Sequence, residues 1–177
     1  NGDKEAVDAI LSEKDIAAIS FVGSSKVASY IYQKAAQFNK RVQALGSAKN
    51  HMVIMPDADI EQASDALIGA AYGSAGERCM AISVAVAVGD VGDKLIENIK
   101  PKINNIKVGP YNDSKSDMGP VVSKEAFERI NKLIDSGVSS GAELVLDGRN
   151  VKLQGYENGY FIGPCLFDKV KDNMDIY

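Results

Sequence analysis

The feature that most restricts the fold of this chain is a repeated change between strand-like and helix-like spacing of apolar residues. Between 82 and 88, β-branched side chains alternate with Ala and Ser, which is typical of a strand. Between 123 and 139, apolar side chains recur every three or four residues, as in an amphipathic helix. Because such segments alternate along the whole chain, the sequence predicts an α/β fold with a largely parallel sheet. Further strands are expected at 17–23, 41–45, 51–55, 143–148 and 160–167, and further helices at 5–12, 25–38, 60–74 and 95–106.

Local signals refine three of these helices. Asp59 is expected to cap the helix that begins at Ile60, with Gln62 three residues further on. This helix is apolar on most sides between 60 and 74, so it is expected to be buried. Pro101 is expected to kink or shorten a later helix. The apolar stripe of the helix at 25–38 is predicted to consist of Val27, Tyr30, Ile31, Ala35 and Phe38.

Composition and charge narrow the class of protein. The chain has 177 residues, of which 45% are hydrophobic and 25% charged, as in an ordinary globular protein. A net charge of −4 and a pI near 5.1 argue against nucleic acid or a membrane surface as the partner. Apolar runs are all shorter than the roughly 20 residues that a membrane helix needs. The first residues have neither the basic start nor the apolar core of a signal peptide.

The cysteines and the chain ends add two expectations. Cys79 and Cys165 are too few for a disulfide framework, which favours a reducing, cytoplasmic location. The sequence begins with Asn1 rather than Met and stops at DNMDIY without a capping signal. We therefore expect this chain to be a fragment of a longer enzyme.

The first candidate binding element is the turn FVGSS at 21–25, between a predicted strand and a predicted helix. Backbone N–H groups at a helix N-terminus, next to a glycine and a serine hydroxyl, suit a phosphate or pyrophosphate. The alternative is an ordinary N-cap, which the same residues would form. The GxGxxG fingerprint of dinucleotide-binding proteins is absent.

The second candidate is Cys79, which follows Arg78 in the stretch GERC. A reactive thiol needs cationic neighbours and access, whereas a structural thiol needs only apolar packing, and the two residues alone leave both readings open. Arg78 is either a surface charge or a group that holds an anionic substrate beside the thiol. His51, the single histidine, could form a thiol-peptidase dyad with Cys79, but its place at the start of an apolar strand favours a structural role. Metal binding is not expected, because the ligand types never cluster.

Five stretches of the chain together resemble the aldehyde dehydrogenase superfamily. FVGSS, LGSAKN and GERC follow the order and spacing of the family patterns FTGS, LELGGK and GQxC. KVGPYNDSKSDMGPVVS and GYFIGPCLFDKV are similar to the later family stretches VGxP…D…GP and GYFxxPTL, with Cys165 in place of the family threonine. The resemblance covers essentially the whole chain. It implies the end of a Rossmann-like NAD-binding domain at 1–46, followed by part of an α/β catalytic domain at 47–177.

Within the superfamily, the chain looks most like the coenzyme A-acylating branch, the methylmalonate-semialdehyde and malonate-semialdehyde dehydrogenases. The stretches RVQALGSAKNHMVIMPDAD and GSAGERCMA carry this resemblance. When Lys49 is aligned with the lysine of LELGGK, Leu45 occupies the position of the glutamate that activates water in most members. Because leucine cannot act as a base, the acyl-enzyme is expected to wait for a thiol, and coenzyme A fits that role. Gly46-Ser47 is a second, milder departure from the motif.

The resemblance also implies roles for individual residues. Cys79 matches the family nucleophile, which forms a thioester after hydride transfer to NAD. Arg78 matches an arginine that binds the carboxylate of a semialdehyde substrate, and His51 returns to a structural role. The residues matching the cofactor site are Phe21, Gly23 and Ser24 near the pyrophosphate, and Gly46 beside the nicotinamide. Loss of the substrate carboxylate as CO₂ and acyl transfer to coenzyme A would complete the reaction.

Two rival functions and two further expectations follow. One rival is a hydrolytic NAD(P)-dependent aldehyde dehydrogenase that uses another base. The other is a non-catalytic truncated fragment that binds a partner through exposed sheet edges. The isolated chain is expected to be inactive or nearly so, because the family's oxyanion asparagine and EEIFGP motif lie outside it. The resemblance implies that the full-length enzyme is a homo-oligomer, a tetramer.

Overall fold

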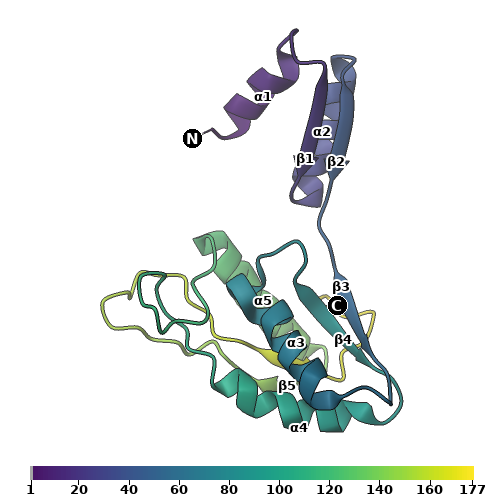
Figure 1. Cartoon of the computed structure of the whole chain (residues 1–177). Helices are drawn as coiled ribbons and strands as arrows, with labels where there is room; N and C mark the ends of the chain where they lie inside the picture. Colours follow the sequence, from purple (N-terminus) through teal and green to yellow (C-terminus); the bar gives the residue numbers. More distant parts are fainter. Residues whose placement is uncertain (1) are drawn as a thin grey trace. The chain divides into compact units, whose positions relative to one another are not determined.

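The computed structural model describes residues 2–177, which divide into two compact units (Figure 1). The first unit ends at Ala48, and the second extends from Lys49 to Tyr177. Each unit combines helices with paired strands, so the predicted α/β class is confirmed. Over residues 2–177, every helix is too short or too polar to cross a membrane.

The first unit is a parallel strand pair packed against helices. β1 and β2 pair in parallel from Ala18 opposite Arg41 to Val22 opposite Leu45. The connection between them passes through α2, as a parallel pairing requires a crossover. A small core of Leu11, Ile31 and Ala35 lies under the sheet. The elements of this unit are α1 (Lys4–Ser12), β1 (Ala18–Val22), α2 (Ser25–Gln37) and β2 (Arg41–Leu45).

The buried face of α2 differs from the predicted stripe. Val27 and Phe38 are 41% and 43% exposed, so they do not belong to the core. The buried residues are Ala28, Ile31 and Ala35, which are spaced for one helix face. The two alanines allow α2 to lie close to the sheet, and this requirement of packing shifts the buried face toward small residues.

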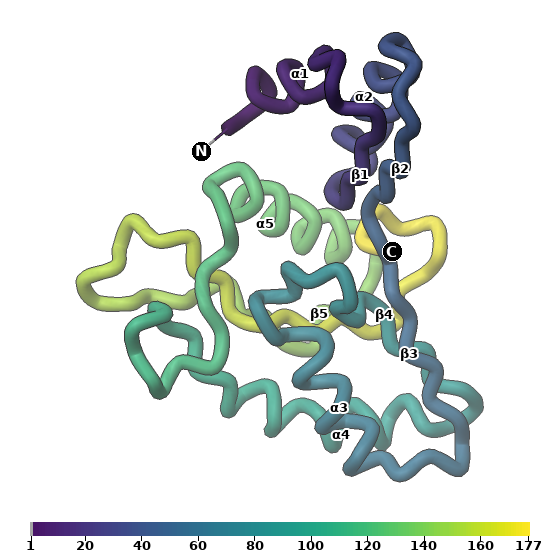
Figure 2. The backbone as a smooth tube through the Cα atoms, turned by 45° about the horizontal axis from the view of Figure 1, so that its top comes forward, coloured from purple at the N-terminus to yellow at the C-terminus, as the bar shows by residue number. Residues whose placement is uncertain are grey.

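The second unit holds the larger core, formed where α3 and α4 pack beside the strand pair β3–β4. Figure 2 shows these two helices side by side from a second direction. The buried core residues of this layer are Ile54, Leu67, Val91, Leu95, Ile99 and Ile103. The elements of the unit are β3 (Asn50–Ile54), α3 (Ile60–Tyr72), the 3₁₀ turn η1 (Gly73–Gly76), β4 (Ile82–Ala87), α4 (Val91–Asn104), α5 (Lys124–Ser139), β5 (Glu143–Leu146) and β6 (Leu166–Asp168).

Two predictions about α3 have different outcomes. The cap is confirmed, because the Asp59 carboxylate accepts a hydrogen bond from the Gln62 N–H at 3.1 Å. Burial of the helix on most sides is wrong, since only Ser64 and Leu67 are buried. α3 contacts α4 along one face, where the Ser64 hydroxyl donates to the Asn98 carbonyl oxygen at 2.5 Å and accepts from the Lys102 ammonium at 2.7 Å. The apolar residues elsewhere on α3 are mostly alanines, which add little hydrophobic drive for burial.

Pro101 does not shorten its helix as expected. α4 extends from Val91 to Asn104 with Pro101 inside it. The proline is exposed, and the helix ends three residues later, so the ring disturbs only the last turn. Ile106 follows the helix rather than belonging to it.

The predicted strand at 160–167 is mostly irregular. Only Leu166–Asp168 forms a strand, β6, and it pairs with β5 antiparallel, whereas β1–β2 and β3–β4 are parallel. Pro164 has no N–H to donate to a ladder, which limits the strand. The Gly163 N–H instead donates to the Gly148 carbonyl at 2.8 Å. A Cβ on Gly163 would lie 2.7 Å from that carbonyl oxygen, so the two backbones meet where neither residue carries a side chain.

Candidate active site

Cys79 lies in a tight turn between η1 and β4, and its thiol is free and exposed. The turn is closed by a hydrogen bond of 3.0 Å from the Ala81 N–H to the Arg78 carbonyl. Within residues 2–177, the thiol is therefore not packed in either core. Within residues 2–177, the backbone N–H groups of Cys79 and Met80 have no hydrogen-bond acceptor.

The chain reaches this turn through three successive residues in the left-handed region. Their φ angles are 53° at Ser74, 53° at Ala75 and 74° at Gly76. For residues other than glycine, this conformation costs roughly 1–2 kcal/mol each. The segment ends α3 abruptly and redirects the backbone toward Cys79. Strained backbone of this kind is typical of functional sites.

Arg78 is exposed, and its side chain folds back onto the end of α3. Its Nη2 donates to the carbonyl of Gly69 at 2.6 Å and to that of Ala70 at 3.4 Å. Gly73 makes room for it, because a Cβ there would lie 2.8 Å from Nη2. A cation at this position offsets the negative end of the helix, which would otherwise oppose a thiolate at Cys79.

Asn50 is the residue of this site that sequence reasoning missed. Its side-chain Nδ2 donates to the Cys79 carbonyl at 2.8 Å and to the Ala81 carbonyl at 2.9 Å. On the other side of the turn, the Glu77 carboxylate accepts from the Val122 N–H at 3.2 Å. The available signal was a lone amide at the start of an otherwise apolar strand, next to a motif lysine.

His51 does not form the dyad that was considered for Cys79. Its Nδ1 lies 2.8 Å from the Lys49 carbonyl oxygen, and its Nε2 lies 2.9 Å from the Tyr177 hydroxyl. Both ring nitrogens are therefore engaged with groups other than the thiol. Over residues 2–177, no cluster of three or more His, Cys, Asp and Glu side chains has the geometry of a metal site.

In the first unit, the predicted phosphate-binding turn is an N-cap. The Ser24 hydroxyl accepts from the Val27 N–H at 3.4 Å. The Ser25 N–H donates to the Ser47 hydroxyl at 3.2 Å, and the Ser47 N–H donates to the Ser25 hydroxyl at 3.0 Å. Within the described residues this leaves the Lys26 N–H as the first-turn donor without an acceptor.

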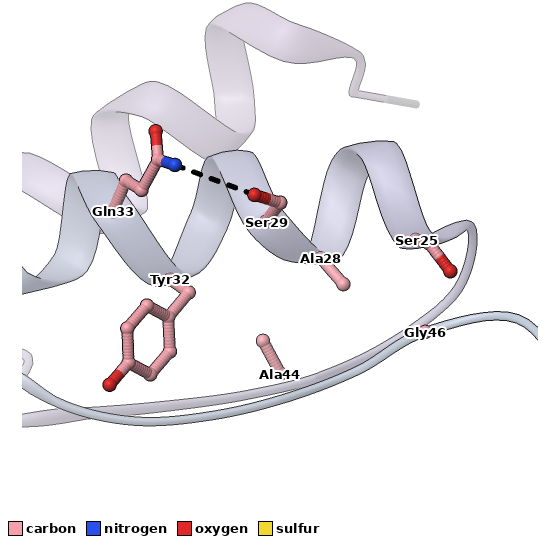
Figure 3. Close-up of a pocket in the computed structure, with 7 residues that line it drawn as sticks. All are labelled: Ser25, Ala28, Ser29, Tyr32, Gln33, Ala44 and Gly46. Atoms are coloured by element: carbon pink, nitrogen blue, oxygen red, sulfur yellow. Dashed lines mark hydrogen bonds between the residues drawn. The ribbon is translucent and has the colours of Figure 1, made fainter.

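The other predicted cofactor residues gather around the same helix end. Gly23 lies against the Phe21 ring, and a Cβ there would meet the ring at 2.5 Å. A Cβ on Gly46 would lie 2.6 Å from the Ser25 hydroxyl oxygen. Gly46 also lines an open cavity of about 370 Å³ along α2 (Figure 3). Of the predicted cofactor residues, Gly46 is the only one among the described residues that line this cavity. The other lining residues are Ser25, Ala28, Ser29, Tyr32, Gln33 and Ala44.

The two cysteines differ in burial. Cys165 is partly buried, its sulfur accepts from the Gly148 N–H at 3.3 Å, and burial raises the pKa of this thiol. Burial also lowers the pKa of the Lys49 ammonium, which donates to the Ile176 carbonyl at 2.9 Å. Cys79 is thus the accessible thiol of the two.

Residues 1–177 match the aldehyde dehydrogenase family. The chain is 56% identical to the malonate-semialdehyde dehydrogenase of Pseudomonas aeruginosa, over 100% of this chain and 36% of that protein. It is 46% identical to the human mitochondrial methylmalonate-semialdehyde/malonate-semialdehyde dehydrogenase [acylating], over 100% of this chain and 33% of that protein.

A crystal structure from Sinorhizobium meliloti 1021, assigned as a methylmalonate-semialdehyde dehydrogenase complexed with NAD, is similar with a TM-score of 0.97. Its sequence is 64% identical, and the match covers 100% of this chain and 36% of that one. The chain therefore spans about a third of the length of these relatives.

Proposed function

The chain belongs to the aldehyde dehydrogenase family, and on that premise we propose that it supplies the nucleophile of an NAD-dependent, coenzyme A-acylating semialdehyde dehydrogenase. The substrate proposed is malonate or methylmalonate semialdehyde, by analogy with the relatives bearing those names. The observation that carries the proposal is Cys79, an exposed thiol on a turn whose backbone is fixed by its neighbours.

The two compact units are consistent with separate roles in cofactor binding and in catalysis. We assign the first to the end of the NAD-binding domain and the second to part of the catalytic domain. The boundary between the units falls at Ala48 and Lys49, two residues beyond the one expected from the sequence.

Cys79 is proposed to attack the aldehyde carbon as its thiolate, forming a carbon–sulfur bond while the carbonyl π electrons move to oxygen. The oxyanion would be stabilised by the backbone N–H groups near the thiol, which have no acceptor within residues 2–177. Bound NAD would supply the acceptor for the hydride that leaves the former aldehyde carbon. The product on the protein is a thioester of Cys79.

The N-terminus of α2 fits the phosphate groups of NAD. Among the α-helices in residues 2–177, α2 alone has no acidic residue in its first turn. The others carry Glu5, Glu61, Asp93 or Glu125 there. The Lys26 N–H would donate to a phosphate oxygen, and the helix dipole would favour its charge. Beside this terminus, the Phe21 ring fills the space next to Gly23 and the Ser25 side chain fills the space next to Gly46, so both positions require glycine.

Leu45 favours transfer of the acyl group to a thiol over hydrolysis. It ends β2, and its carbonyl accepts from the Gly23 N–H at 3.1 Å, while its side chain has no group that could take a proton from water. Coenzyme A brings its own nucleophile, so its sulfur would attack the thioester carbon and release the Cys79 thiolate. Before this step the substrate carboxylate would leave as CO₂, and the electron pair of the broken carbon–carbon bond would stay on the α-carbon of the thioester, which takes up a proton from water.

Arg78 is proposed to bind the substrate carboxylate. Its Nη2 is occupied by the carbonyls at the end of α3, but its Nε and Nη1 have no acceptor within residues 2–177. Arginine carries five N–H donors, so it can bind a carboxylate without leaving the helix.

The test uses the protein that carries this chain, incubated with NAD and malonate semialdehyde with and without coenzyme A. NADH is followed by absorbance, and the protein is quenched in acid for mass analysis of the peptide containing Cys79. We expect steady turnover only with coenzyme A, an acyl adduct on Cys79 without it, and neither in C79S. Steady turnover without coenzyme A would support the hydrolytic alternative. Turnover retained in C79S, or no NADH at all, would overturn the proposal.

A further inference from the structure

We propose that Asn50 is a positioning residue for Cys79, whose side-chain amide fixes the direction of the backbone N–H groups beside the thiol. This inference rests on the proposed function only in taking Cys79 as the nucleophile. Its structural part concerns the turn at 78–81 and is tested without any enzymatic activity.

The side-chain amide of Asn50 donates both of its hydrogen bonds to this one turn. Nδ2 lies 2.8 Å from the Cys79 carbonyl oxygen and 2.9 Å from that of Ala81. The contacts join residues 29 and 31 positions apart, so they are tertiary and not part of a local turn motif. Two carbonyls held by one rigid amide group leave the peptide between them little freedom to rotate.

An irregular register between β3 and β4 lies beside Asn50 and accompanies its contacts with the turn. Asn50 begins β3 opposite Ile82, but the next residue, His51, pairs with Val84, so the ladder is irregular at this point. The irregularity adds one residue to β4 just after the cysteine turn. Such a local change of register re-aims side chains at the end of a strand.

Fixing the carbonyls also fixes the opposite side of each peptide. In a trans peptide the C=O and N–H groups point in opposite directions. Because the Cys79 carbonyl faces Asn50, the Met80 N–H faces away from it. Because the Arg78 carbonyl accepts from the Ala81 N–H, the Cys79 N–H is likewise turned away from the closing bond of the turn. Asn50 therefore directs the Met80 N–H, and by holding the turn that the Ala81–Arg78 bond closes it also supports the direction of the Cys79 N–H.

The first experiment measures the turn itself. Trypsin cleaves after Arg78 only when residues on both sides become locally extended, so the cleavage rate reports opening of the turn. We expect N50A to be cleaved there about thirtyfold faster than the unaltered chain, because two hydrogen bonds worth about 1 kcal/mol each are lost. N98A is the control, because the Asn98 side chain also makes two hydrogen bonds, accepting from the Ser64 hydroxyl and donating to the Glu61 carboxylate, at the α3–α4 contact.

The second experiment measures catalysis in the protein that carries this chain. A reactive group displaced by about 1 Å can lose about a hundredfold in rate, so N50A should lower kcat at least about tenfold. The KM for NAD should change less than about twofold, whereas N98A should leave both constants near their original values. N50S, which keeps one donor, should fall between N50A and the unaltered protein, and it also serves if N50A does not fold.

The outcomes separate this inference from the proposed function. Faster cleavage together with the selective loss of kcat supports it. Unchanged cleavage in both Asn50 variants, or faster cleavage with unchanged kcat, would overturn it while Cys79 remains the nucleophile. Turnover retained in C79S would remove the proposed function, and the cleavage rates would still show whether Asn50 holds the turn.

Discussion

The turn at the start of α2 and the turn around Cys79 are held by side chains in opposite ways. At the start of α2, serine hydroxyls accept hydrogen bonds from the backbone N–H groups of Ser25 and Val27. Around Cys79, side-chain N–H groups of Asn50 and Arg78 donate to backbone carbonyls instead. The turn at the start of α2 therefore has most of its N–H groups occupied, whereas the turn around Cys79 keeps the N–H groups of Cys79 and Met80 free.

This difference shows what each turn is able to bind. A helix N-terminus with a free N–H at Lys26, helped by the helix dipole, is suited to a diffuse charge such as that of a phosphate. A turn with two free N–H groups next to a thiol is suited to a charge that develops on one oxygen atom. Polar side chains act in both places as constraints on the backbone, and the choice of donor or acceptor decides which backbone groups remain available.

The largest expected effect on stability comes from a substitution at Gly46, which lies against Ser25 in the turn at the start of α2. In Gly46→Ala the new Cβ would lie 2.6 Å from the Ser25 hydroxyl oxygen and 3.1 Å from the Ser25 Cα. Overpacking of this kind should lower the free energy of unfolding of the first unit by about 2 kcal/mol. The midpoint of urea unfolding, followed by hydrogen exchange in α2, measures this.

Gly69→Ala is the matched control for that change. Nothing lies within 4 Å of a Cβ built at Gly69, and the residue is inside α3. The substitution should stabilise the second unit by about 0.5–1 kcal/mol, because alanine is the better helix former. Equal effects at the two glycines would mean that the close approach between Gly46 and Ser25 does not constrain the turn.

A comparison of the two thiols sharpens the description of the second turn. Burial raises the pKa of Cys165 and restricts access to its sulfur, whereas Cys79 is exposed. At pH 8, about tenfold faster alkylation of Cys79 by iodoacetamide is expected, measured by peptide mass spectrometry. Because a raised pKa keeps the Cys165 thiol protonated until higher pH, its rate should approach that of Cys79 as the pH rises. Equal rates at pH 8 would contradict the assigned environments.

A smaller effect is expected from the cap of α2. Ser24→Ala removes the acceptor of the Val27 N–H and should cost about 1 kcal/mol, whereas Ser24→Gly should cost only a few tenths. Ser123 caps α5 in the same way, accepting from the Ala126 N–H at 3.2 Å, so Ser123→Ala should be equally destabilising. Calorimetry with NAD distinguishes the two caps, since only Ser24→Ala should weaken NAD binding. A similar loss of NAD affinity in both variants would argue against a cofactor role for Ser24.

The smallest expected effect concerns the left-handed segment before Cys79. Ala75→Gly relieves the strain of a φ of 53°, worth roughly 1–2 kcal/mol, and loses about 0.5–1 kcal/mol through added freedom of the unfolded chain. The net result should be a stabilisation of about 0.5 kcal/mol in urea unfolding. Gly76→Ala is the opposite change at φ 74° and should destabilise. If both changes destabilise, the strain at Ala75 is not real.

Local signals predicted much of the frame of the molecule. Asp59 with Gln62 marked the start of α3, and the alternation between 82 and 88 marked β4, because capping and sheet burial depend on near neighbours in the sequence. The sequence of the turn 21–25 fits both an N-cap and a phosphate site. The structure shows the cap at Ser24, and the phosphate role remains a prediction.

The details of the candidate site depend on contacts that local patterns do not encode. The bonds from Asn50 to the Cys79 turn exist only because β3 and β4 pair in parallel with a shifted register. The position of Arg78 beside Cys79 makes it a candidate in the sequence. Its hydrogen bond to the Gly69 carbonyl, however, requires the left-handed segment that precedes it. The irregular stretch at 160–165 has the apolar residues typical of a strand, but Pro164 cannot donate to a ladder, so the local pattern predicts a strand that does not form.

The close backbone contact between Gly148 and Gly163 limits which substitutions this protein can accept during evolution. Most contacts between side chains tolerate a change on one side if a second mutation restores the fit on the other. Here each Cβ would run into the opposite backbone, and no replacement of the partner residue can make room. Variation in related enzymes should therefore accumulate around this crossing while the two glycines stay, and a library of substitutions at either position should return almost only the original residue among folded variants.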